Sequence, residues 1–150
     1  MGTLPIRIAD LVGAVTANVY FILVIAVFSA RLFGRLDIAR WFGLISFLTI
    51  IPLAYLLFQG FSTGRQHVYF LWIGLMAAFL LLELLVDYVF KIEFRSIRWA
   101  TVVYVMFFFG ATGGMIGVAS QAGRWWTVVT AAIFLVMAVL AFVQRAKTGL

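Results

Sequence analysis

Five long stretches of the chain consist almost entirely of apolar residues, and short polar segments separate them. The stretches cover about residues 11–32, 41–58, 68–90, 97–119 and 125–143. At a rise of about 1.5 Å per residue, helices of this length can cross a hydrocarbon core of about 30 Å with the help of interfacial aromatic residues. The polar segments are too short to form a folded domain outside a membrane. The pattern therefore predicts a single all-α transmembrane domain over residues 1–150, built as a bundle of five helices.

Residues at the edges of these stretches indicate where the helices begin and end. Gly34 follows the first stretch, and glycine is favoured just past a helix C-terminus. Asp37 and Ser96 are good N-cap residues, so we expect the second and fourth helices to begin there. Gln59 and Gly60 mark the expected end of the second helix.

Two details of the apolar stretches refine this prediction. Pro52 has no backbone N–H, which leaves the carbonyl of Leu48 without its helical partner and predicts a kink in the second helix. A secretory signal peptide is the rival interpretation of the first stretch. Its apolar run is too long for one, and Phe28-Ser29-Ala30 is a poor cleavage site.

The composition agrees with an integral membrane protein. Hydrophobic residues make up 66% of the chain, charged residues only 11%, and the mean hydropathy is +1.18, far from the balance of soluble domains. The chain has no cysteine, which excludes disulfides, thiolate zinc sites, iron–sulfur ligation and cysteine nucleophiles.

Lysine and arginine are distributed unevenly between the two predicted sides of the bundle. Eight lie in the segments after the first and third helices and in the C-terminal tail: Arg31, Arg35, Arg40, Lys91, Arg95, Arg98, Arg145 and Lys147. Three lie on the opposite side: Arg7, Arg65 and Arg124. The positive-inside rule then predicts an outside N-terminus and a cytoplasmic C-terminus. Sidedness also explains the net charge of +6 better than nucleic-acid binding does. We expect a multi-pass protein of a prokaryotic plasma membrane.

Tryptophan and histidine receive no ligand role in this interpretation. The five tryptophans fall near predicted helix ends, where amphipathic rings favour the headgroup region: Trp41, Trp72, Trp99, Trp125 and Trp126. His67, the single histidine, is predicted to be a solvated residue at the outer surface rather than a metal ligand.

The third stretch contains two acids, Glu83 and Asp87, one helical turn apart. Their spacing puts both on one face of the helix, which Lys91 continues by one more turn. Glu83 lies roughly 10 Å inside the predicted hydrocarbon, and Asp87 lies near its boundary. In one interpretation Asp87 pairs with Lys91, and Glu83 is protonated or bonded to a neighbouring helix.

In the other interpretation the acids form a site for a proton, an ion or a small molecule. Two carboxylates about 6 Å apart in a poorly solvated setting do not both stay ionised, so one is expected to hold an exchangeable proton. Intramembrane acids generally face a bundle interior or a wet cavity and often mark ion or proton pathways. Polar residues at matching depth that could complete the site are Tyr104, Ser46 and Thr49, with Thr101, Ser29 and Arg31 as further candidates.

The fourth stretch contains a run of small residues, GATGGMIG, at residues 110–117. Two overlapping GxxxG spacings lie in it: Gly110 with Gly114, and Gly113 with Gly117. Small residues at this interval let helix backbones approach closely in lipid. The first stretch has a small patch at the same depth: Gly13, Ala14, Ala17 and Asn18. We expect these two helices to pack together there, or one of the surfaces to form a homodimer contact.

The glycine run and Asn18 each have an alternative interpretation. The glycine run could instead be a broken helix whose backbone groups bind an ion or an anionic group, although GxxxG spacings are common in packing surfaces. Asn18 is expected to form a hydrogen bond between helices, with contact to a ligand as the minority interpretation.

Three classes of function fit this sequence. The leading one is a small membrane protein that binds or translocates an ion, a proton or a small molecule, as a homo-oligomer because five helices are few for a lone transporter. The second is a non-catalytic structural or regulatory subunit of a larger membrane complex. The third, an intramembrane enzyme with an acidic dyad, is the weakest, because no HExxH motif or serine with a histidine base is present. We expect no cofactor, no metal and no nucleic-acid partner.

Overall fold

The computed structural model describes residues 8–91 and 96–148, and every regular element in those ranges is helical. The elements are α1 (Ile8–Leu32), α2 (Leu36–Ser46), the 3₁₀ turn η1 (Phe47–Thr49), α3 (Ile50–Thr63), α4 (His67–Glu83), the π-helix η2 (Leu84–Val89), α5 (Arg98–Ser120) and α6 (Arg124–Thr148). Two of the five long helices are composite, since α2, η1 and α3 follow one another directly, as do α4 and η2. All five are long and apolar enough to cross a membrane, which confirms the five-helix, all-α prediction.

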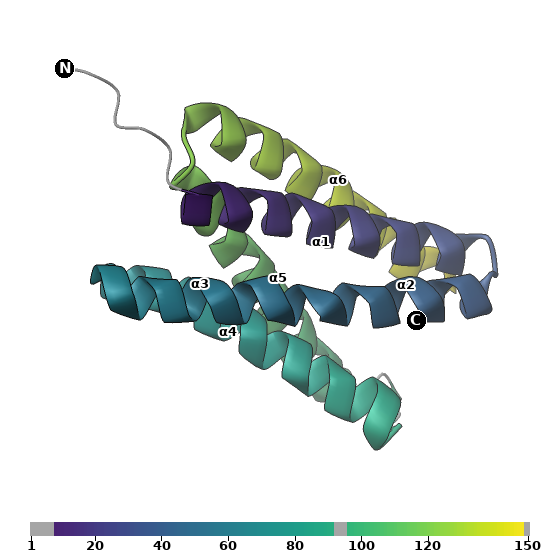
Figure 1. Ribbon diagram of the computed structural model, residues 1–150. Helices are drawn as coiled ribbons and strands as arrows, with labels where there is room; N and C mark the ends of the chain where they lie inside the picture. The colour runs from purple at the N-terminus through teal and green to yellow at the C-terminus, as the bar shows by residue number, and fades with distance from the viewer. Residues whose placement is uncertain (1–7, 92–95, 149–150) are drawn as a thin grey trace.

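Successive long helices run in opposite directions (Figure 1). The α1–α2 turn, the end of η2 and the C-terminal end of α6 therefore lie at one end of the bundle, which we call the basic end. The α3–α4 and α5–α6 turns lie at the other end. Seven lysines and arginines belong to the basic end: Arg31, Arg35, Arg40, Lys91, Arg98, Arg145 and Lys147. Arg7 and Arg95, counted in the sequence, lie outside the described residues.

Helix α1 is the centre of the bundle and contacts α2, α3, α5 and α6. Half of its most apolar window is buried, against 11% for α6, because α6 packs on one side only. The core beside α1 is rich in aromatic rings. Phe79 contacts the rings of Tyr104, Phe107 and Phe108 at centroid distances of 5.4–5.5 Å. Edge-on ring contacts of this kind fix the register between α4 and α5.

The helix ends agree with the sequence prediction at some positions and correct it at others. Gly34 has a left-handed φ of 72° just beyond α1, which confirms it as the helix stop. Asp37 lies inside the first turn of α2, which follows Arg35, so the N-cap prediction for Asp37 is wrong. Its charge still favours the helix N-terminus. Ile97, not Ser96, precedes α5.

The predicted end of the second helix at Gln59 and Gly60 is also wrong. Helix α3 continues to Thr63, and the turn falls at Gly64, which has a φ of 65°. Gly60 is instead a packing residue, because a Cβ there would lie 2.9 Å from the ring of Phe70. Several helices also extend past the apolar stretches, since polar residues continue the helix after the hydropathy has fallen.

The region before Pro52 shows the expected disturbance of the helix. The chain tightens into the 3₁₀ turn η1, which contains Leu48, the residue whose carbonyl loses its partner at Pro52. The hydroxyl of Thr49 donates a hydrogen bond to the carbonyl of Ser46 at 2.6 Å. The hydroxyl of Ser46 in turn donates to the carbonyl of Gly43 at 2.5 Å. These local bonds hold the irregular turn in place.

Candidate functional site

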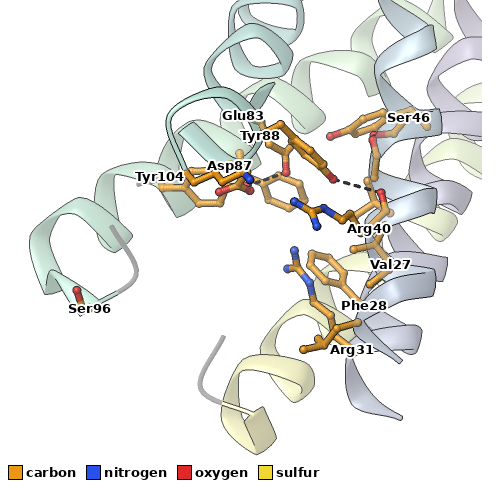
Figure 2. Close-up of a pocket in the computed structure, with 17 residues that line it drawn as sticks. Val27, Phe28, Arg31, Arg40, Ser46, Glu83, Asp87, Tyr88, Ser96 and Tyr104 are labelled. Atoms are coloured by element: carbon orange, nitrogen blue, oxygen red, sulfur yellow. Dashed lines mark hydrogen bonds between the residues drawn. The ribbon is translucent and has the colours of Figure 1, made fainter. Parts of the chain in front are cut away.

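A cleft of about 770 Å³ opens at the basic end, between α1, α2, η2 and α5 (Figure 2). Apolar side chains line part of its wall: Val24, Val27 and Phe28 from α1, Leu36 and Ala39 from α2, and Phe108 from α5. Three tyrosines also line it: Tyr20, Tyr88 and Tyr104. Five charged side chains line it as well: Arg31, Arg40, Glu83, Asp87 and Lys91. The other lining residues are Gly43, Ser46 and Ser96. The volume falls within the range of about 300–1,000 Å³ that is typical of small-molecule sites.

Glu83 and Asp87 both face this cleft and both are half-buried. Glu83 ends α4, and its Oε1 accepts a hydrogen bond from the Tyr104 hydroxyl of α5 at 3.1 Å. The ring of Tyr104 is held in turn by its contact with Phe79 in the core. The carboxyl of Glu83 is therefore oriented by a donor on a neighbouring helix and remains within reach of the cleft.

The π-helix η2 shapes the floor of the cleft around Asp87 and Tyr88. The N–H of Phe90 bonds to the carbonyl of Leu85, five residues earlier, at 2.8 Å, which makes this turn wider than an α-helical turn. Asp87 and Tyr88 are adjacent in the chain, yet both line the cleft. π-turns of this kind are frequently found at functional sites.

Tyr88 also connects η2 to the opposite wall of the cleft. Its hydroxyl donates to the backbone carbonyl of Arg40 at 3.4 Å, and its ring packs edge-on against Phe47 at 5.1 Å. Gly43 has no side chain, which leaves room for the Tyr88 hydroxyl on the surface of α2. The side chain of Tyr88 therefore bridges the two helical walls.

The predicted partners of the acids divide into two groups. Tyr104 and Ser46 line the cleft together with Glu83 and Asp87. Thr49 does not line it, because its side chain is buried in the 3₁₀ turn, where its hydroxyl bonds to the helix backbone.

The sequence analysis missed Tyr20, Tyr88 and Arg40 as residues of the cleft. A signal for the first of these was present, because Tyr20, Val24, Val27 and Arg31 follow one another at intervals of four, three and four residues and so share one face of α1. The inward direction of Tyr88 depends on the π-turn, for which the sequence carried no signal.

A second, smaller cavity of about 80 Å³ lies on the other side of Tyr104, between α5 and α6. Tyr104, Phe28 and Phe108 line both cavities. Thr101 lines only this one, together with Gln144, a buried polar residue near the end of α6. Polar side chains therefore continue past Tyr104 toward the α6 surface.

The glycine run of α5 follows the prediction in part, because α5 packs against α1 at Gly13 but directs the groove of Gly114 and Gly117 toward α4. Added Cβ atoms at Gly114 and Gly117 would lie 3.1 Å and 2.7 Å from the Trp72 side chain, so α4, rather than α1, fills this groove. Trp72 is consequently partly buried, whereas Trp41, Trp99 and Trp125 are exposed near helix ends. No atom lies within 4 Å of the Cβ positions of Gly110 and Gly113, so neither makes a close contact in the described part of the chain.

The small patch of α1 has partners on three helices. A Cβ at Gly13 would lie 2.8 Å from Val118 of α5 and 3.5 Å from Leu56 of α3. The side-chain amide of Asn18 donates to the Thr130 hydroxyl of α6 at 3.0 Å. It also donates to the carbonyl of Ala14 at 2.8 Å. Asn18 therefore forms the expected hydrogen bond between helices.

An ion pair at the opposite end of the bundle was not predicted. Arg65, in the α3–α4 turn, pairs with Asp10 in the first turn of α1, and both side chains are largely buried. The guanidinium also lies over the ring of Tyr69, 4.9 Å from its centroid. His67 beside it is exposed, as expected. The pair joins the start of α1 to the turn between α3 and α4.

Among the residues that the structure describes, no group of three histidine, cysteine or acidic side chains is placed to hold a metal ion. Comparison with protein-family models, curated proteins and solved structures finds no match to the chain. The function is therefore argued from the cleft itself.

Proposed function

We propose that this chain is a multi-pass membrane protein whose five long helices span a lipid bilayer, with the N-terminus outside and the basic end in the cytoplasm. Large apolar side chains are exposed along all five helices, an arrangement that suits lipid and not water. The clustering of lysine and arginine at one end supports the orientation through the positive-inside rule.

The absence of cysteine makes this orientation easy to test. Phe33→Cys, in the α1–α2 turn, and Thr63→Cys, at the end of α3, introduce single thiols at exposed positions at opposite ends of the bundle. A membrane-impermeant maleimide should label Thr63→Cys in intact cells and Phe33→Cys only after permeabilisation. The cysteine-free parent chain is the control for background labelling. Labelling in the reverse pattern would overturn the proposed orientation.

In this orientation the protein binds an ion, a proton or a small molecule at the carboxyl of Glu83 in the cleft. The observation that carries the proposal is the position of Glu83, which accepts a hydrogen bond from Tyr104 and also lines a cleft large enough for a ligand. A carboxyl directed into lipid could exchange nothing, and one sealed in a dry core could not be reached. Glu83 is half-buried and lines the cleft, which supports a carboxyl that a ligand can reach.

The cleft supports binding from the cytoplasmic side as the first event. Beyond Tyr20 and Phe108 the bundle is filled by buried side chains, among them Phe79, Ile73 and Met115. Translocation across the bilayer therefore requires these side chains to separate, whereas binding does not. A homo-oligomer is the assembly we propose for the translocating form.

The proposal is tested by comparing Glu83→Gln with Asp37→Asn, an acid-to-amide change at an exposed position outside the cleft. In infrared difference spectra recorded across a pH step, a protonated-carboxyl band should be present in the parent and in Asp37→Asn and absent in Glu83→Gln. In proteoliposomes, proton or ion flux should fall only in Glu83→Gln. A carboxyl band and a flux that Glu83→Gln leaves unchanged would remove Glu83 as the site.

One observation favours the subunit function as a second candidate. Gly110 continues an exposed stripe of α5 that also contains Trp99, Val103 and Met106, and no atom lies within 4 Å of its Cβ position. Such a stripe suits close packing of a further helix. In native membranes Met106→Cys should then form a disulfide with a different chain, whereas linkage between two copies of this chain would support the homo-oligomer instead. Leu135→Cys on the exposed face of α6 is the control. Equal cross-linking of the two variants would argue against a specific interface.

A further inference from the structure

We propose that the cleft seats the phosphate group of a phosphate ester between Arg31 and Arg40, an inference that rests on the proposed binding role of this cleft. Arg31 belongs to the last turn of α1, and Arg40 belongs to α2. The left-handed turn at Gly34 folds these two helices against each other. Two cationic side chains from consecutive helices are thereby brought to one cleft.

The direction of the two side chains is the first argument. Figure 2 shows both guanidinium groups pointing into the cleft and toward each other. Within residues 8–91 and 96–148, neither Arg31 nor Arg40 forms a salt bridge. Two like charges that converge at the boundary of a poorly solvated region repel each other, and a shared anion relieves this repulsion.

The balance of charge in the cleft is the second argument. Its lining contains three cationic side chains, Arg31, Arg40 and Lys91, and two acidic ones, Glu83 and Asp87. Among the described residues of the lining, cationic side chains therefore outnumber acidic ones, which suits an anionic ligand. Guanidinium groups bind phosphate oxygens through paired, planar hydrogen bonds, and one phosphate has enough oxygens for two arginines.

The remaining lining indicates why the phosphate belongs to a larger molecule. The cleft of about 770 Å³ far exceeds the size of inorganic phosphate. Next to the arginines its wall is apolar, formed by Val27 and Phe28. The matching ligand is therefore an ester, either a membrane phospholipid or a soluble phosphate ester, with its organic part against this wall.

Binding to purified protein in a nonionic detergent distinguishes these sources. The probes are phosphatidylglycerol, diacylglycerol with the same chains, and glycerol 3-phosphate, and native mass spectrometry measures the bound fraction as each probe is titrated. Phosphatidylglycerol or glycerol 3-phosphate should bind, and whichever binds more tightly identifies the lipid or the soluble source. Diacylglycerol that binds as tightly as phosphatidylglycerol would overturn the proposal, because the phosphate would then contribute nothing.

The variants assign the effect to the two arginines. Arg31→Gln and Arg40→Gln should each weaken binding by about tenfold, since each removes a charge-assisted contact. Arg31→Lys keeps the charge and should fall between Arg31→Gln and the parent. Arg35→Gln, an exposed change in the same turn but outside the cleft, should change the affinity by less than about twofold. Equal weakening by Arg35→Gln and Arg31→Gln would indicate general attraction to the basic end and would overturn the site.

Failure of this inference is distinguishable from failure of the proposed function. If phosphate binding survives the double substitution of Arg31 and Arg40 while the Glu83 carboxyl band and flux remain as proposed, only the phosphate assignment is lost. If the arginine variants lose binding and Glu83→Gln changes neither the carboxyl band nor the flux, the phosphate site stands and the acidic site falls. Circular dichroism and size-exclusion chromatography of each variant confirm that the comparison is between folded proteins.

Discussion

Replacement of Gly117 by alanine is the sharpest test of how α4 and α5 pack. An alanine Cβ at this position would lie 2.7 Å from two ring atoms of Trp72, whereas ordinary van der Waals contact begins at 3.4 Å. The indole must therefore move by roughly 0.7 Å in an interface that is already close-packed. The backbone of Trp72 also lies close to α5, since a Cβ at Gly114 would lie 3.4 Å from the Trp72 Cα, and this limits the movement.

The magnitude follows from a comparison with Gly113→Ala. Overpacking of this kind costs about 1–3 kcal/mol in the free energy of unfolding. Both substitutions gain the same helix propensity, up to about 1 kcal/mol, and at Gly113 nothing lies within 4 Å of the new Cβ. The difference between the two variants therefore isolates the packing term, and we expect Gly117→Ala to be less stable than Gly113→Ala by about 1–3 kcal/mol.

The measurement is the free energy of unfolding in mixed micelles, obtained by titration with sodium dodecyl sulfate and followed by circular dichroism. Gly117→Ala is also measured in the Trp72→Phe background, because the smaller phenyl ring leaves room for the alanine Cβ. The penalty of Gly117→Ala should shrink in the Trp72→Phe background. Equal stability of Gly117→Ala and Gly113→Ala, or an unchanged penalty in that background, would refute the packing of Trp72 on the glycine groove.

Three further predictions concern single polar contacts. Asp10→Asn breaks the largely buried pair with Arg65 and should cost more than the roughly 1 kcal/mol of an exposed pair and less than the about 3–5 kcal/mol of a fully buried one, as measured by the same titration. Asn18→Leu removes the hydrogen bond between α1 and α6 and should destabilise the bundle by about 0.6–2 kcal/mol in that assay. Tyr104→Phe removes the donor to Glu83 and should move the infrared band of its carboxyl to higher wavenumber, because a hydrogen bond weakens the C=O bond.

Each of these predictions has a result that contradicts it. A double-mutant cycle on Asp10 and Arg65 that returns no coupling would mean that the pair is not formed in the folded protein. Unchanged stability of Asn18→Leu would mean that the hydrogen bond from Asn18 to Thr130 does not stabilise the bundle. A carboxyl band of Glu83 that is identical in the parent and in Tyr104→Phe would show that the two side chains do not meet.

Much of the candidate site could be predicted from the spacing of residues within single helices. Glu83 and Asp87 are four residues apart, so a helix puts them on one face whatever surrounds it. Tyr104 was predicted from depth alone, because residues equally far from two helix ends lie at similar heights in an antiparallel pair. Thr49 was predicted from its depth in the same way. It lies outside the cleft, because the depth of a residue does not determine which side of its helix faces the cleft.

Other features needed contacts between helices and could not be read from the sequence. The π-turn that contains Asp87 and Tyr88 meets α2 through the hydroxyl of Tyr88, a contact between residues far apart in the sequence. Gly117 packs against Trp72 of α4 and not against a residue of α1. Which helix it faces depends on the relative rotation of α1, α4 and α5. Hydropathy is nearly uniform around such helices, so it carries little information about which face is buried.

By itself the sequence determined the number and apolar character of the helices, since a run of about 20 apolar residues can satisfy its backbone polar groups in lipid only as a helix. It also determined which charged residues belong to each end of the bundle. Only the tertiary structure decided that Arg31, Arg40, Glu83 and Asp87 share one cleft. The physical reason is that a helix fixes the height and mutual angle of its own side chains, whereas its rotation against its neighbours is set by close packing of complementary shapes.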